Sequence, residues 1–192
     1  MYHEGNRQLQ DRFESRALAD RLAEKLRRDL FTEGDAAFIA AQPFFFLATA
    51  DREGRPDCSF KGGPPGFVRV IRPDLLVFPD YDGNGMFKSL GNLAANPQVG
   101  LLFIAMGEKP GRIRVNGTAE LVFDDPLMAE TPGAQMLVQV TPTDIFPNCP
   151  RYIPRMELSE PSIYTPQAEA VPVEPRWKSF PDFADVVPPR RR

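Results

Sequence analysis

The apolar residues of this chain follow two patterns, and the change between them divides the sequence. Over residues 8–30 they recur at roughly helical spacing among Arg, Glu and Asp, which predicts an amphipathic helix with a solvated polar face. Thr32 and the acidic residues after it form a capping signal, and DAAFIAAQ then predicts a short helix that ends before Pro43. Helical periodicity stops at that proline.

Beyond Pro43 the chain consists of short runs rich in branched and aromatic residues. Turn sequences such as DREGR, GGPPG and GEKPG separate the runs PFFFLATA, the segment around Cys58 to Lys61, GFVRVI, LLVF, VGLLFI and RIRVNGTAELVF. Serial strands with tight turns predict an antiparallel sheet or barrel, and the alternation of Ile113 and Val115 is typical of a strand with one face in a core. We therefore expect a mainly β protein, a small barrel with peripheral helices.

The last third of the chain follows a different pattern. QMLVQVTPTDIF predicts one more strand, but prolines accumulate after Cys149 and prevent long regular elements. Apolar residues spread along this irregular tail could anchor it, namely Tyr164, Trp177, Phe180 and Phe183. Because a free linker would be polar, we expect the tail to pack on its own barrel or across a partner subunit, and both packings stay open.

Length and composition favour one compact domain. A chain of 192 residues can bury one good hydrophobic core. Its formal net charge of −3 does not indicate a protein that binds nucleic acid through an overall positive charge. The start of the chain is polar, and PFFFLATA is too short to span a bilayer, so we expect a cytoplasmic protein without a signal peptide. The predicted organisation is a helical segment (1–34), a barrel domain (35–150) and a proline-rich tail (151–192).

The scarcity of histidine limits the kinds of catalytic and metal sites that the chain can form. The chain has one histidine, His3, close to a terminus. Catalytic triads need a histidine that the fold places, and zinc sites usually need several His or Cys ligands, so we expect neither a triad nor a metal site. Cys58 and Cys149 are more typical of small apolar residues than of nucleophiles. We assign no catalytic residue, and any catalysis would depend on a cofactor that the protein binds and orients.

A glycine-rich loop is the strongest candidate for a binding site. Residues 80–103 join a strand end, the loop DGNG, a short helix over 89–95 and a second strand. Backbone N–H groups converge at such helix starts and attract anions, and Lys88 and Ser89 lie there, so the segment predicts a phosphate-bearing ligand. Structural alternatives stay open: Lys88 as an exposed helix residue, Ser89 as a helix cap and Asn84 as a left-handed turn residue.

Three segments together resemble a known family. FFFLATADREGRPDCSFKGG, GFVRVIRPDLLVFPDYDGNGMFKSLGNLAANPQVGLLFI and GRIRVNGTAELV, in this order, are similar to the flavin-nucleotide-binding split barrels related to pyridoxamine 5′-phosphate oxidase. The resemblance covers about residues 36–123, and NCPRYI at 148–153 is similar to the tail of a less-characterised branch of that group. It implies an antiparallel split β-barrel that binds FMN at a homodimer interface.

The resemblance also implies which residues surround the cofactor. The matching positions are Ser59, Phe60, Lys61 and Gly62 beside the flavin ring, Lys88 and Ser89 at the phosphate, Asn84 and Met86 along the approach to it, and Arg112 and Arg114 on a strand that contacts the flavin. Ordinary structural roles remain open as well: Lys61 as a strand-end lysine, and the two arginines as partners in surface ion pairs. Trp177 could stack on a flavin or simply anchor the tail.

The chain departs from the oxidase itself. Ser59 stands where the oxidase has an arginine, and the Arg-x-His pair that holds the substrate of the oxidase has no counterpart, because the only histidine is His3. We therefore expect an FMN-dependent oxidoreductase that acts on another, unidentified small molecule. The alternatives are a reductase that uses the deazaflavin F420, a non-enzymatic flavin carrier or sensor, and a haem-handling relative, the last disfavoured by the lack of histidine.

Overall fold

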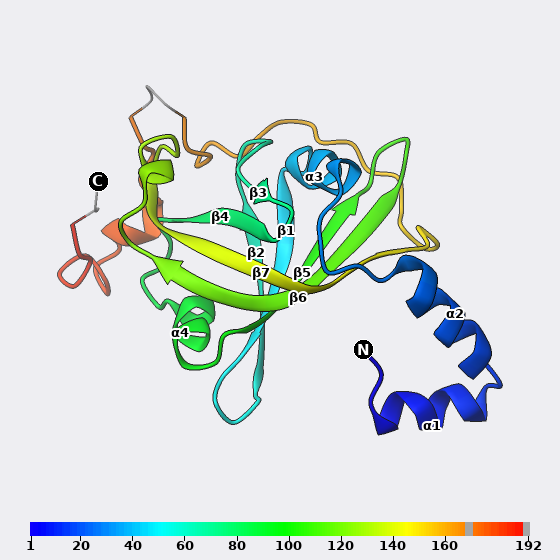
Figure 1. The fold of residues 1–192 in the computed structure, drawn as a ribbon. Coiled ribbons are helices and arrows are strands. Elements are labelled where there is room, and N and C mark those ends of the chain that lie inside the picture. Colours follow the sequence, from blue (N-terminus) through cyan, green and yellow to red (C-terminus); the bar gives the residue numbers. More distant parts are fainter. Residues whose placement is uncertain (168–170, 190–192) are drawn as a thin grey trace.

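The computed structural model describes residues 1–167 and 171–189 and has a single curved sheet as its centre (Figure 1). The helices are α1 (Glu4–Arg12), α2 (Arg16–Leu26), α3 (Glu33–Ala40) and α4 (Lys88–Ala95), with short 3₁₀ turns η1 (Pro126–Met128) and η2 (Arg176–Ser179). The strands are β1 (Phe44–Ala50), β2 (Pro56–Gly62), β3 (Arg69–Arg72), β4 (Leu75–Tyr81), β5 (Gln98–Ala105), β6 (Gly111–Val122) and β7 (Ala134–Asn148).

The prediction of a mainly β, antiparallel fold is confirmed. The seven strands follow the order β2-β1-β5-β6-β7-β4-β3, and every neighbouring pair is antiparallel. The sheet is not closed by hydrogen bonds, since β2 and β3 are its edges. It curls far enough, however, that Lys61 of β2 reaches Asp80 of β4, with 3.2 Å between Nζ and Oδ1. One ion pair thus connects an edge strand to the other side of the barrel.

The core lies inside the curl and follows the alternation of the strands. On β6, Ile113 and Val115 are buried while Arg114 is exposed, as the sequence pattern predicts. Aromatic rings fill the centre, where the ring of Phe45 lies 5.0 Å from that of Phe78 and 5.1 Å from that of Phe103. Strand β4 is buried over six of its seven residues, because a second small cluster around η1 covers its outer face.

Close contact between β6 and β7 requires a glycine. The register between these strands shifts at Asn116 and Gly117. A Cβ atom on Gly117 would lie only 2.2 Å from the backbone oxygen of Thr141, far inside van der Waals contact. Any other residue there would push the two longest strands of the sheet apart.

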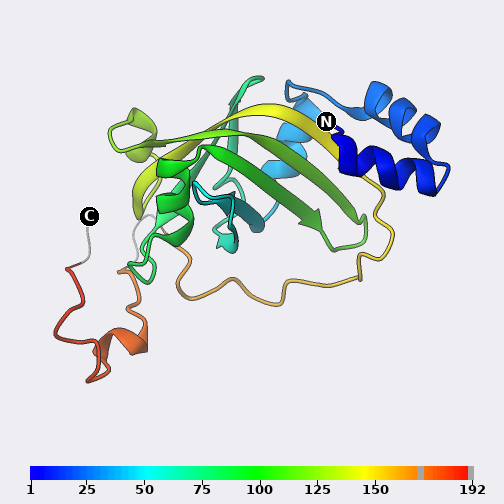
Figure 2. The ribbon, with the colours of Figure 1, turned by 90° about the horizontal axis from the view of Figure 1, so that it is seen from below.

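The N-terminal helical prediction is wrong in one respect. Instead of one helix over residues 8–30, two helices meet at Glu14, whose φ of 52° is left-handed and reverses the chain. An ion pair of 2.6 Å between Arg7 and Asp20 joins them, and neither helix buries a residue (Figure 2). Helical spacing continues across Glu14 and Ser15, neither of which is a strong helix breaker, so periodicity alone could not reveal the reversal.

Helix α3 begins as its sequence predicts. The Thr32 hydroxyl accepts a hydrogen bond from the Asp35 N–H at 3.1 Å, and the Asp35 carboxylate accepts one from the Thr32 N–H at 2.9 Å, which completes a capping box. The guanidinium of Arg28 also donates to both carboxylate oxygens of Asp35. The run GFVRVI is only partly a strand, because β3 begins at Arg69 while Phe67 leaves the sheet to stack on Phe45.

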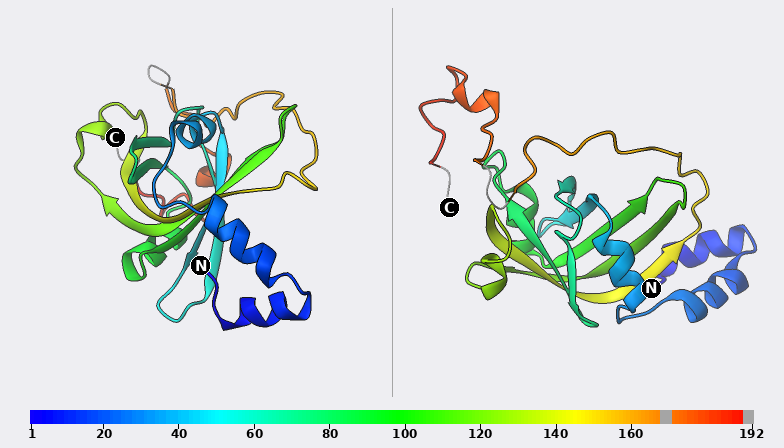
Figure 3. Two further views of the ribbon diagram at one scale, coloured as in Figure 1. Left: turned by 45° about the vertical axis from the view of Figure 1, so that its right-hand side comes forward. Right: turned by 90° about the horizontal axis from the view of Figure 1, so that it is seen from above.

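The tail beyond β7 runs along the barrel without entering the sheet. Figure 3 shows it crossing from the end of the molecule that carries α2 to the opposite end, near α4. The Met156 N–H donates to the Met106 carbonyl at 2.8 Å, so the first part of the tail contacts its own barrel. Over residues 1–167 and 171–189, no helix is long and apolar enough to cross a membrane.

Candidate functional site

A pocket of about 470 Å³ opens at the end of the barrel where α4 begins, a volume within the usual range of small-molecule sites. Three parts of the chain form most of it, namely β2 with the end of β4, the glycine-rich loop with the first turn of α4, and the tail, and the start of β7 adds Gln135. Its lining includes Asp57, Ser59, Phe60, Lys61, Asp80, Tyr81, Asp82, Asn84, Phe87, Lys88, Ser89, Gln135, Trp177, Lys178, Val187, Pro188 and Pro189.

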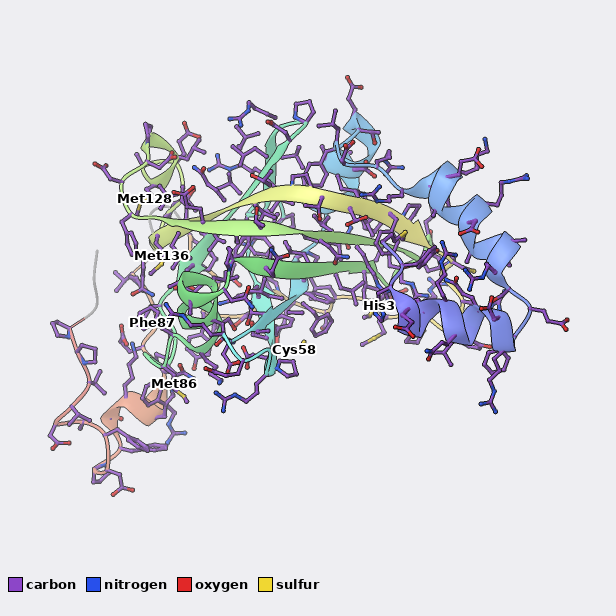
Figure 4. All side chains as sticks on the ribbon, turned by 60° about the horizontal axis from the view of Figure 1, so that its bottom comes forward. His3, Cys58, Met86, Phe87, Met128 and Met136 are labelled. Carbon is purple, nitrogen blue, oxygen red and sulfur yellow. The ribbon has the colours of Figure 1, made fainter. Side chains whose placement is uncertain are left out.

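The pocket brings together six of the ten residues predicted from the sequence, namely Ser59, Phe60, Lys61, Asn84, Lys88 and Ser89. They come from two segments about 25 residues apart, which only the curl of the sheet makes neighbours. Of the other four, Gly62 ends β2 just outside the lining, and Met86 points into solvent with 72% of its surface exposed (Figure 4). Arg112 and Arg114 lie on β6, which β1 and β5 separate from β2, so they do not line this pocket.

A polar corner, formed by Asp57, Ser59 and Ser89, is part of the pocket lining. Ser89 is buried, and its Oγ lies 2.8 Å from Asp57 Oδ2 and 3.0 Å from Ser59 Oγ. Because a hydroxyl has one proton and a carboxylate can only accept, Ser89 donates to Asp57 and accepts from Ser59. The expectation that Ser89 caps its helix is therefore wrong. The N-cap of α4 is Phe87, with φ 47° and no side-chain cap, and Ser89 turns toward β2 instead.

The glycine-rich loop is held by its own backbone and by one side chain. The Asn84 side-chain oxygen accepts a hydrogen bond from the Met86 N–H at 3.0 Å, while the left-handed positions are Gly85, at φ 75°, and Phe87. Asn84 thus shapes the turn through its side chain rather than through a left-handed backbone, contrary to the structural alternative drawn from the sequence. The loop leads directly into α4, whose first amides have no intrahelical acceptor.

The charges in the pocket are mixed. Lys88 is exposed and forms no ion pair within the described residues, so its ammonium is available to a ligand. Lys61, in contrast, is engaged with Asp80, a carboxylate that is only 6% exposed. Burial raises the pKa of Asp80 above its ordinary value, and the nearby Lys61 opposes that shift.

Tyr81 follows Asp80 at the end of β4 and also faces the pocket. Burial raises the pKa of its phenol to about 12, despite the opposing effect of the Arg69 charge. The phenol therefore stays neutral over the physiological range and acts there as a hydrogen-bonding group.

The tail forms the third wall, which the sequence indicated only through Trp177. Lys178 Nζ lies 2.5 Å from Asp82 and 3.2 Å from Glu174, and the hydrogen bond to Asp82 raises the pKa of Lys178. This contact ties the tail to the glycine-rich loop and places the half-buried Trp177 on the pocket, where its ring meets Phe183 edge-on at 6.1 Å. Nothing in the sequence marked Lys178, because its partner lies 96 residues away.

A comparison with protein families assigns most of the chain to one family. The family model described as pyridoxamine 5′-phosphate oxidase matches residues 31–148. The chain belongs to this family. The match includes α3, α4 and all seven strands, whereas α1, α2 and the tail wall of the pocket lie outside the part that defines the pyridoxamine 5′-phosphate oxidase family. A search of curated proteins finds no match.

One solved structure shows the same fold at low sequence identity, and two others are more distantly similar. A putative pyridoxamine 5′-phosphate oxidase from Lactobacillus delbrueckii has a TM-score of 0.50 and 22% identity, over 62% of this chain and 95% of that chain. HupZ of group A Streptococcus has a TM-score of 0.49 and 17% identity, over 62% and 94%. An FMN-binding protein from Syntrophomonas wolfei has a TM-score of 0.48 and 11% identity, over 73% and 97%.

The groups around the pocket fit a flavin nucleotide in kind. Phe87 and Trp177 offer apolar surfaces for a planar ring, and the free ammonium of Lys88 beside the start of α4 suits a phosphate. A haem has no histidine ligand in the pocket lining, because the only histidine of the chain, His3, caps α1 and lies apart from Met86 and Phe87 (Figure 4). The carboxylate of Asp57 is less favourable to a phosphate, because it forms no ion pair within the described residues, unlike Asp80 and Asp82.

Proposed function

We propose that this protein binds FMN in the pocket between β2, α4 and the tail and acts as an FMN-dependent oxidoreductase on a small molecule. The observation that carries the proposal is the pocket itself, which gathers Ser59, Lys61, Lys88 and aromatic walls from distant segments of a chain in the pyridoxamine 5′-phosphate oxidase family. FMN, when bound, supplies hydride or electron transfer. The residues of the chain bind and orient it, and the tail keeps water from one side.

The roles of individual residues follow from their positions. Lys88, without an ion-pair partner in the described structure, neutralises the phosphate. Lys61 keeps its ammonium at the ring side of the pocket, where Asp80 fixes its position at 3.2 Å. The absence of the Arg-x-His pair of the oxidase supports a substrate other than pyridoxamine phosphate.

We also propose that the protein forms a homodimer. Phe44, Phe46 and Phe60 form an aromatic cluster on the outer face of β1 and β2, with Phe44 and Phe60 stacked at 5.3 Å, and Phe60 is 62% exposed. Burial of this cluster against another subunit would place a dimer interface beside the pocket. Sedimentation at micromolar concentration tests it, and a monomer with full FMN affinity would contradict a shared site.

Titration of the purified protein with FMN and with riboflavin tests the cofactor assignment. Lys88→Ala should weaken FMN by about tenfold, the value of one charge-assisted contact, and leave riboflavin unchanged. Lys109→Ala, an exposed lysine in the turn between β5 and β6, is the matched control and should change neither affinity. Wild-type protein that binds no FMN would refute the assignment. Equal weakening of both flavins would show that Lys88 does not bind the phosphate.

Rapid-mixing reduction separates the enzyme from a carrier. An oxidoreductase should accept electrons from NADPH, NADH or reduced F420 within seconds, whereas the flavin of a carrier would stay oxidised. Tight binding of F420 in place of FMN would instead support a reductase that uses the deazaflavin F420.

A further inference from the structure

The polar corner has an unusual property for a site next to a phosphate, because it contains a carboxylate without a cation. Asp57 Oδ2 accepts from Ser89, but Oδ1 has no hydrogen-bond partner, and Asp57 forms no ion pair with any described residue. Asp57 is only half-buried and belongs to the lining of the pocket, so its carboxylate is accessible to a ligand there. The polar corner therefore presents hydrogen-bond acceptors, and a ligand that binds there must supply hydrogen-bond donors.

A phosphate does not supply the hydrogen-bond donors that Asp57 lacks. Its oxygens are acceptors with negative charge, so a phosphate in contact with Asp57 would be repelled and would leave the carboxylate oxygen without a donor. A hydroxyl group suits the polar corner, because it can donate to Asp57 while its oxygen accepts from a lysine. The chemistry of the corner therefore matches the hydroxyls of a polyol chain.

The positions along β2 agree with this. Asp57, Ser59 and Lys61 occupy alternate positions and so share one face of the strand, over roughly 13 Å at the usual rise per residue. Ser89 meets the Asp57 end of this row, and Lys88 precedes it at the mouth of the pocket. A ligand along the row would meet Lys61, then the corner, then Lys88.

We infer that Asp57, together with Ser59 and Ser89, binds the hydroxyl groups of a polyol chain in the ligand, between a ring at Lys61 and a phosphate at Lys88. The inference rests on the proposed function, because the ribityl chain of FMN has this place between ring and phosphate. It also changes the sequence-based assignment of Ser89, which binds the chain rather than the phosphate.

Three flavins separate these roles: FMN, riboflavin, which lacks the phosphate, and lumiflavin, which lacks the whole polyol chain. Asp57→Ala should weaken FMN and riboflavin equally, by about 10- to 100-fold, since a hydrogen bond to a charged group is lost. Lumiflavin should bind as it does to the wild type, which also shows that the pocket of the variant is intact. Asp124→Ala, at an exposed aspartate outside the pocket lining, is the matched control.

The alternatives give different results. If Asp57 only opposes a phosphate at the corner, Asp57→Asn will bind FMN more tightly and riboflavin as before, and the inference is overturned. Equal loss of all three flavins would show a purely structural role, and no loss would show no role, so either result also overturns it. Wild-type protein that binds no flavin refutes the proposed function and this inference together, whereas the other outcomes leave the proposed function in place.

Discussion

The ion pair between Lys61 and Asp80 allows a quantitative test of how the barrel is held together. Lys61 lies on edge strand β2 and Asp80 on β4, so the pair joins two parts of the sheet that share no backbone hydrogen bonds. At 3.2 Å and an effective dielectric of about 20, the attraction is about 5 kcal/mol. The Lys61 side chain is 22% exposed, so water screens part of it, and Asp80 can take up a proton. We therefore expect Lys61→Ala to reduce the free energy of unfolding by about 2–4 kcal/mol at pH 7.5.

The pH dependence of this loss follows from the pKa of Asp80. Burial already raises this pKa above its ordinary value of 3.8, and removal of Lys61 raises it further. The folded protein then holds the proton more tightly than the unfolded chain, so stability falls as pH rises from the ordinary pKa through the folded one. The cost of Lys61→Ala should therefore be smallest at low pH, where Asp80 is protonated with and without Lys61, and should grow as the pH rises.

Urea unfolding of the protein without added flavin measures these differences. Asp80→Asn in the Lys61→Ala background should restore most of the lost stability, because the amide needs no counter-charge. Lys25→Ala is the matched control, since Lys25 pairs with Glu24 at 2.7 Å but both side chains are more than half exposed, and it should cost less than about 1 kcal/mol. A Lys61→Ala cost below that of Lys25→Ala, or one that Asp80→Asn does not relieve, would refute the reasoning.

Three further predictions concern packing, titration and the tail. Gly117→Ala should lower the free energy of unfolding in urea by at least about 2 kcal/mol, because its Cβ would lie 2.2 Å from the Thr141 oxygen. Gly107→Ala, where a Cβ would have no atom within 4 Å, should be neutral. Equal losses for the two variants would contradict the close approach of β6 and β7. In an alkaline titration followed by phenolate absorbance, Tyr81 should ionise at about pH 12, and Tyr81→Phe should remove that late step; its contribution to stability is present below pH 10 and declines above it. Trp177, the only tryptophan, should lose fluorescence when FMN binds, and unchanged emission would place the flavin away from the tail.

The sequence predicted the class of fold because strand alternation and turn residues are local signals. Ile113 and Val115 revealed the buried face of β6, and Thr32 with Asp35 revealed the start of α3, since both patterns depend on neighbours in the chain. The reversal at Glu14 carried no such signal, and two helices replaced the predicted one.

The candidate site was partly predictable for the same reason. The glycine-rich loop pointed to Lys88 and Ser89 through a local motif, and both line the pocket. The family resemblance added Ser59 and Lys61 from another segment, yet it could not show that Arg112 lies away from this pocket in a single chain.

By itself, then, the sequence determined the strands, their alternation and the loop that opens α4, because these depend on residues close together in the chain. Only the tertiary structure decided which side chains share the pocket. The curl of the sheet places Asp57 against Ser89, 32 residues away, and the return of the tail places Lys178 against Asp82, 96 residues away. These contacts depend on how the curved sheet brings its edges together, and no local pattern encodes such a distance. Because Ser89 meets Asp57 of β2, it lines the pocket instead of capping α4.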